Sequence, residues 1–85
     1  MKKMDFNGQK NICGENVRLI RLKQKLSQTN LAAKMQVMGV SIEQDAISRI
    51  ESGERLVTDY EVKALAEALG VGYDLLLNSG NNQRR

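Results

Sequence analysis

The sequence contains no proline and no histidine, and its single cysteine is Cys13. The absence of proline, together with many strong helix formers such as leucine, alanine, glutamate and lysine, favours an all-helical domain. One cysteine excludes an intramolecular disulfide, which fits a reducing compartment, so we expect a cytoplasmic protein. Without histidine, a metal-ligand cluster or a nucleophile beside a base, we expect no enzymatic activity, no cofactor and no metal.

Aromatic residues and long hydrophobic runs are also scarce. Only 4% of the 85 residues are aromatic, against 41% hydrophobic overall, so aliphatic side chains must fill the core of one small domain. No apolar run approaches the ~20 residues that a membrane span needs. The N-terminal lysines are not followed by an apolar stretch, so we expect neither a secretory signal nor an association with membranes.

The net charge of +3 is distributed unevenly along the chain. Residues 1–40 carry eight lysines and arginines against two acidic residues, a balance of +6, whereas residues 41–85 carry five against eight, a balance of −3. Such asymmetry is typical of a protein with one face for a polyanion. Solvated charge alone would give the same split, and the two interpretations carry about equal weight.

The segment from Ser41 to Gly53 has the features of one short helix with both ends encoded. Ser41 is a suitable N-cap, Gln44 completes a capping box three residues later, and Gly53 can adopt the left-handed conformation that ends a helix. Its apolar stripe consists of Ala46, Ile47 and Ile50. The other side chains are polar, and their amide, hydroxyl and guanidinium groups are of the kind that bind base edges in a DNA major groove. Taken alone, the segment is better explained as an ordinary surface helix.

Four other helices are expected from capping residues, glycines and apolar stripes. Their ranges are Asn11 or Gly14 to about Lys25, Ser27 to about Met38, Thr58 to Leu69, and Tyr73 to Leu77. In the second of these, the expected inward side chains are Leu31, Ala32, Met35 and Met38. Gly39 then provides a tight connection to Ser41, and two helices joined so closely form a helix-turn-helix pattern. We expect this domain to span residues 13–77, after a flexible basic arm (1–12) and before a polar tail (78–85).

Two charged residues are expected to face the core. Arg21 lies on the inward line of the first helix, between Val17 and Gln24. Glu51 lies four residues beyond Ile47, on the buried side of the third helix. A buried guanidinium without a carboxylate is costly, so we predict a structural ion pair between Arg21 and Glu51.

Three separate motifs occur in order along the chain. They are Ser27-Gln28 with Leu31-Ala32, Ile47-Ser48-Arg49-Ile50-Glu51-Ser52-Gly53, and Ala66-Glu67-Ala68-Leu69-Gly70-Val71. Together they resemble the lambda-repressor-like, Xre-type helix-turn-helix proteins of bacteria and their phages, over about Cys13 to Leu77. The resemblance implies an all-α fold, a compact five-helix bundle whose third helix enters the major groove. The interval from Leu31 to Ile47 exceeds the commonest family spacing by more than one helical turn, so the second helix or the turn must be extended.

Matched residue by residue, the resemblance implies that the positions facing DNA are Gln44, Asp45, Ser48 and Arg49. Gln28 matches a position that contacts phosphate or supports the base-reading glutamine, and Arg55 matches a region that contacts the DNA backbone. Arg21 and Glu51 match the family's internal ion pair. Asp45 could accept a hydrogen bond from a cytosine amino group, disfavour binding to other DNA sequences, or be merely solvated.

These expectations describe a sequence-specific, double-stranded DNA-binding transcriptional regulator, a repressor, that reads the major groove with the helix around residues 41–52. A homodimer on a two-fold symmetric site is expected, because one such helix reads few base pairs. Tyr73, Leu76 and Leu77 could supply the dimer contact or could close the core. The alternative is an antitoxin or a protein-interaction adaptor with the same fold, which would bind a small protein partner.

Overall fold

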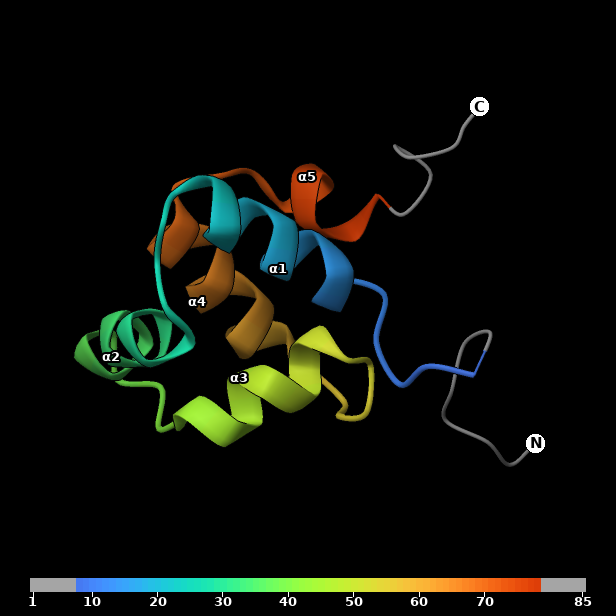
Figure 1. Cartoon of the computed structure of the whole chain (residues 1–85), viewed down its shortest axis with the longest axis horizontal. Coiled ribbons are helices and arrows are strands. Elements are labelled where there is room, and N and C mark those ends of the chain that lie inside the picture. Colours follow the sequence, from blue (N-terminus) through green and yellow to red (C-terminus); the bar gives the residue numbers. More distant parts are fainter. Residues whose placement is uncertain (1–7, 79–85) are drawn as a thin grey trace.

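The computed structural model describes residues 8–78, which fold into five α-helices without a β-strand; parts of the expected arm and tail, residues 1–7 and 79–85, lie outside the described residues. The helices are α1 (Gly14–Lys23), α2 (Gln28–Val37), α3 (Gln44–Glu51), α4 (Asp59–Leu69) and α5 (Tyr73–Leu77). α3 packs against α1 and α2, and α5 packs against α1 and α4. Figure 1 shows α3 along one edge of the molecule and α5 at the opposite edge. The predicted all-α, five-helix architecture is confirmed, and none of these helices is long and apolar enough to cross a membrane.

Several helix ends form where the local sequence predicts them. The Ser27 hydroxyl caps α2 by accepting a hydrogen bond from Asn30 N at 2.9 Å, and Thr58 caps α4 by accepting one from Glu61 N at 3.3 Å. The Glu61 carboxylate completes this second capping box by accepting from Thr58 N at 3.0 Å. After α3, Gly53 adopts φ +82°, in the left-handed region that glycine occupies without strain. These observations confirm the predicted starts of α2 and α4 and the predicted end of α3.

The predicted start of α3 is wrong, because the helix begins at Gln44 rather than near Ser41. Glu43 occupies the N-cap in an extended conformation without a side-chain cap bond, and Ser41 is exposed. Ile42 is only 2% exposed and belongs to the core. Burying it contributes about 1.5–3 kcal/mol, more than the ~1 kcal/mol of a serine cap. The connection from α2 to α3 is therefore the segment 38–43 rather than a tight turn, and it accommodates the long interval between the two helices.

Two expected inward side chains are instead exposed. Met38 is 40% exposed, whereas Val40, two residues later, is half-buried and packs against the core. Gln24 is exposed as well, although its Nε2 donates a hydrogen bond to Leu69 O, at the end of α4, at 2.7 Å. Both differences arise at helix ends, where the chain leaves the line that helical spacing defines.

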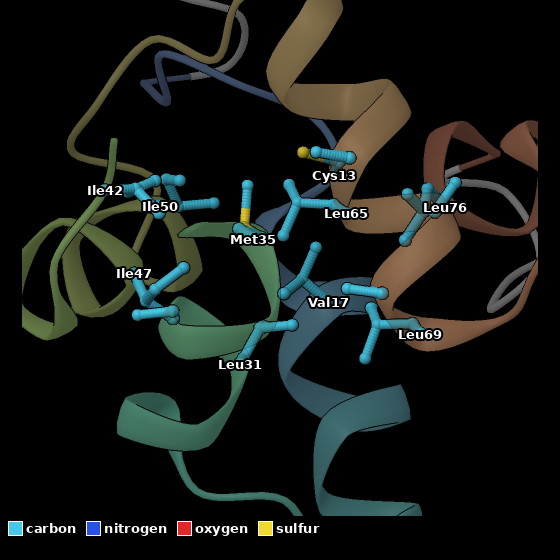
Figure 2. Close-up of a cluster of buried hydrophobic side chains, with 14 residues drawn as sticks. Cys13, Val17, Leu31, Met35, Ile42, Ile47, Ile50, Leu65, Leu69 and Leu76 are labelled. Atoms are coloured by element: carbon cyan, nitrogen blue, oxygen red, sulfur yellow. The ribbon is translucent and has the colours of Figure 1, made fainter. Parts of the chain in front are cut away.

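Aliphatic side chains from all five helices meet in one core (Figure 2). Those that are fully buried include Val17 from α1, Leu31 and Met35 from α2, Ile47 and Ile50 from α3, Leu65 from α4 and Leu76 from α5. The residues of the last helix are expected from the sequence either to supply a dimer contact or to close the core. Leu76 closes the core, whereas Tyr73 and Leu77 remain exposed. The core thus holds the inner side of α3 and leaves the outer side uncovered.

The segment before α1 is bound to the end of α3. Lys10 N donates a hydrogen bond to Gly53 O at 2.8 Å. Asn11 Nδ2 donates to Ile50 O at 3.0 Å and to Arg55 O at 2.8 Å. This part of the expected arm is therefore fixed to carbonyl groups at and just after the C-terminal end of α3.

Gly14, at the start of α1, lies so close to α3 that it has no room for a side chain. A Cβ atom there would lie 1.9 Å from the Ile50 carbonyl oxygen, which cannot move without displacing α3. We predict that Gly14→Ala lowers the free energy of unfolding in urea by roughly 1–3 kcal/mol. The control is Gly72→Ala, where φ is −80° and a Cβ would meet only the flexible Asp74 carboxylate at 3.0 Å. Equal stability of Gly14→Ala and the wild type would contradict this packing.

Candidate nucleic-acid interface

One side of α3 is buried and the other is open. Ile47 and Ile50 are 0% exposed. The side chains predicted to face DNA all lie on the exposed side, namely Gln44, Asp45, Ser48 and Arg49. Figure 1 shows that α3 lies at the edge of the molecule, away from α5. The structure therefore brings the four predicted positions onto one open helical surface.

Asp45 and Arg49 lie one helical turn apart on this surface. Arg49 Nη1 is 3.9 Å from Asp45 Oδ2, and the side chains of Arg49 and Asp45 are 61% and 68% exposed. An exposed pair at this helical spacing contributes only about 0.3–0.5 kcal/mol. Arg49 can therefore leave Asp45 for a stronger acceptor at little cost, and both side chains are available to a ligand.

Gln28 and Gln44 connect the first turn of α2 to the first turn of α3. Gln44 Nε2 donates a hydrogen bond to Gln28 Oε1 at 2.6 Å, and Gln28 Nε2 donates one to Glu51 Oε1 at 3.0 Å. Gln28 is half-buried, whereas Gln44 is exposed. Gln28 thus holds the side chain of Gln44. This geometry fits one of the two roles expected for Gln28, the support of a base-reading glutamine.

Behind the glutamines, Arg21 of α1 and Glu51 of α3 form a bidentate ion pair. Arg21 Nε lies 2.6 Å from Glu51 Oε2, and Arg21 Nη2 lies 3.0 Å from Glu51 Oε1. The two side chains are 9% and 3% exposed, and Arg21 Nη1 also donates to Leu26 O at 2.8 Å. Hydrogen bonding to Glu51 raises the pKa of Arg21 against the opposing effect of burial, so the guanidinium stays charged. The two inward-facing charges are joined, and they fix α1 to α3.

Arg55, in the loop after α3, is held by a carboxylate that sequence reasoning did not assign to it. Its Nη1 and Nη2 donate to Glu61 Oε1 and Oε2 at 3.0 and 3.2 Å. The Glu61 side chain is 6% exposed, and that of Arg55 is 33% exposed. The capping box at Thr58 is the signal that could have revealed this pair, because it turns Glu61 back toward the loop.

Cys13, in the position before α1, is a packed core side chain. It is 1% exposed, and burial raises the pKa of its thiol to about 11. The thiol is therefore protonated at neutral pH and is a poor nucleophile.

The Arg55–Glu61 pair predicts a pH dependence of stability. Burial opposes ionisation of Glu61, but hydrogen bonds from Arg55 and Thr58 outweigh that effect and place the pKa of Glu61 below its ordinary value of 4.5. The stabilisation of the folded state by ionised Glu61 is therefore present above about pH 4.5 and is lost as the pH falls below that value.

We predict that Glu61→Gln lowers the free energy of unfolding at pH 7 by roughly 1–3 kcal/mol. The variant should also lose less stability than the wild type between about pH 5 and pH 3. Urea unfolding at a series of pH values measures both effects. Glu54→Gln, which neutralises an exposed carboxylate near the same loop, is the control. Parallel pH profiles for Glu61→Gln and the wild type would show that the pair does not act in this way.

Comparison with known families agrees with this arrangement. A family model described as helix-turn-helix matches residues 17–76, more than half of the chain, including all of α2 and α3. No curated protein is similar enough to match the chain. The matched family has the all-α lambda repressor-like fold and consists of DNA-binding domains rather than enzymes. The chain therefore belongs to the Cro/C1-type helix-turn-helix family of DNA-binding proteins.

Proposed function

We propose that this protein is a sequence-specific, double-stranded DNA-binding transcriptional regulator that acts as a repressor by occupying its site. The observation that carries the proposal is the open polar side of α3, where Gln44, Ser48 and Arg49 are exposed while Ile47 and Ile50 are fully buried. A helix about 10–12 Å across with such a surface fits a major groove about 12 Å wide. Base edges would be read there by hydrogen bonds from these side chains.

Phosphate contacts would come from the elements on either side of α3. The first turn of α2, with Gln28 at its start, has backbone N–H groups and the positive end of a helix dipole. Arg55 follows α3 and is one-third exposed, so its outer edge can reach a phosphate while Glu61 holds its inner edge. These contacts would supply affinity and register, and the side chains of α3 would supply specificity.

Arg49 is the side chain on α3 best suited to direct base readout. Its guanidinium can bind guanine O6 and N7 in a bidentate manner, and its exposed partner Asp45 restrains it only weakly. We predict that Arg49→Ala weakens binding to a selected duplex by roughly 1–3 kcal/mol and changes binding to a scrambled duplex much less. Fluorescence anisotropy with both duplexes measures the difference.

The matched control for Arg49→Ala is Arg18→Ala, which removes the same charge from an exposed position on α1. It should lower affinity for both duplexes equally, through the general attraction of phosphates. If Arg49→Ala also lowered both affinities equally, the proposed placement of α3 in the groove would be wrong.

A homodimer is part of the proposal, and the groove between α4 and α5 is its expected contact. This groove encloses about 560 Å³ and is lined by Asp59, Tyr60, Val62, Lys63, Tyr73 and Leu77. Exposed tyrosines are enriched at protein interfaces. Asp59 and Lys63 carry opposite charges and both line the groove from α4, so two copies related by a two-fold axis can pair them. Contact there would leave the polar side of α3 free, since α5 lies at the opposite edge (Figure 1).

We predict that Tyr73→Lys raises the dimer dissociation constant at least about tenfold, because it places a charge in the apolar contact. Sedimentation equilibrium measures the change, and affinity for a two-fold symmetric duplex should fall more than affinity for one half-site. The control is Leu22→Lys, in a second open groove between α1 and α5, which should leave the dimer intact. Unchanged self-association in Tyr73→Lys would exclude this contact.

The second groove supports the other candidate function, an antitoxin or adaptor that binds a small protein partner. It encloses about 750 Å³ and contains the exposed leucines Leu19, Leu22 and Leu75. Fluorescence anisotropy with the selected duplex tests this role. A partner protein that raised the DNA affinity of the wild type but not of Leu22→Lys would favour it.

A further inference from the structure

A continuous chain of hydrogen bonds connects the buried ion pair to the open surface of α3. It runs from Arg21 to Glu51, from Glu51 to Gln28, and from Gln28 to Gln44. Gln44 is exposed, Gln28 is half-buried, and the Glu51 side chain is 3% exposed. The chain thus links a charge inside the protein to a side chain on the DNA-facing surface.

The order of donors and acceptors in this chain follows from the charge at its buried end. An ionised carboxylate only accepts hydrogen bonds, so Gln28 must direct its NH₂ group toward Glu51 Oε1. The carbonyl oxygen of Gln28 is then turned toward α3, where it accepts from Gln44 Nε2 at 2.6 Å. Reversing the Gln28 amide would place its oxygen against a buried carboxylate, which is strongly unfavourable.

This order decides what Gln44 can offer to a base. One N–H of its amide is used by Gln28, which leaves the other N–H and Oε1. One donor and one acceptor match the N7 and N6 amino group of adenine. With the amides reversed, Gln44 would instead present two donors, which match N7 and O6 of guanine.

We propose that Glu51, acting through Gln28, sets the amide orientation of Gln44 and thereby directs it to adenine rather than guanine. Glu51 is then a positioning residue for base recognition in addition to its role in the ion pair. This inference rests on the proposed function, because it concerns the base that α3 reads.

The test is selection of bound duplexes from a random DNA pool with the wild type and with Glu51→Gln. A glutamine at position 51 can offer either an oxygen or an NH₂ group to Gln28, so the constraint on the amide is removed while the shape is kept. The wild type should prefer adenine over guanine at one position in each half-site. Glu51→Gln should reduce this preference by roughly tenfold and leave the preferences at other positions unchanged.

A second variant guards against failure of Glu51→Gln to fold. Gln28→Met keeps the Arg21–Glu51 pair but removes the hydrogen bond to Gln44, so it should lose the same adenine preference with little loss of stability. The control is Thr29→Met, which introduces the same side chain at the neighbouring exposed position of α2 and leaves the hydrogen bonds of Gln28 in place. It should keep the adenine preference.

The outcomes separate this inference from the proposed function. If the wild type selected no sequence, the proposed function would fail and this inference with it. If the wild type selected a site in which adenine is preferred, and Gln28→Met kept that preference, the proposed function would stand and the role of Glu51 would be overturned. Gln44→Ala identifies the base position that Gln44 reads. If the wild-type site had no adenine preference that Gln44→Ala removes, the inference would be overturned as well.

Discussion

The fold depends on two opposite charges that must be buried together. Arg21 and Glu51 belong to different helices, and neither could be left in the interior without the other at an acceptable free energy. Their bidentate geometry fixes the distance and the rotation between α1 and α3. Apolar contacts at Ile47 and Ile50 hold α3 against the core, and the bidentate ion pair adds a contact with one defined geometry. The ion pair and the buried isoleucines together determine which side of α3 faces outward.

α3 is only eight residues long, and a helix of this length is not stable by itself in water. Its shape is therefore supplied by the surroundings. Asn11 and Lys10 bind carbonyl groups at its C-terminal end, and Gly14 allows the backbones of α1 and α3 to approach closely. At its N-terminal end the extended segment before Gln44 is held by the buried side chain of Ile42. Support at both ends lets a short helix present its side chains in defined positions.

Features encoded by neighbouring residues could be predicted from the sequence. The caps at Ser27 and Thr58 depend on residues three positions away, and the inward positions of Arg21 and Glu51 follow from helical spacing. The features that could not be predicted depend on contacts between distant segments. α3 starts late because Ile42 is buried, and Asn11 binds α3 across 39 residues of sequence. α1 also ends two residues early, where Lys25 adopts φ +61° without the glycine that usually marks such a turn.

The arginines near α3 differ in how much of their charge remains available to DNA. Arg21 is buried and paired with Glu51, and Arg55 is largely neutralised by Glu61. Arg49 is exposed, and its nearest carboxylate, Asp45, lies at 3.9 Å. Because two of these three charges are offset within the protein, the attraction to phosphates on this side is smaller than the number of arginines suggests. Affinity for DNA in general would then be modest, and a larger share of the binding free energy would come from the hydrogen bonds that α3 makes to one particular sequence.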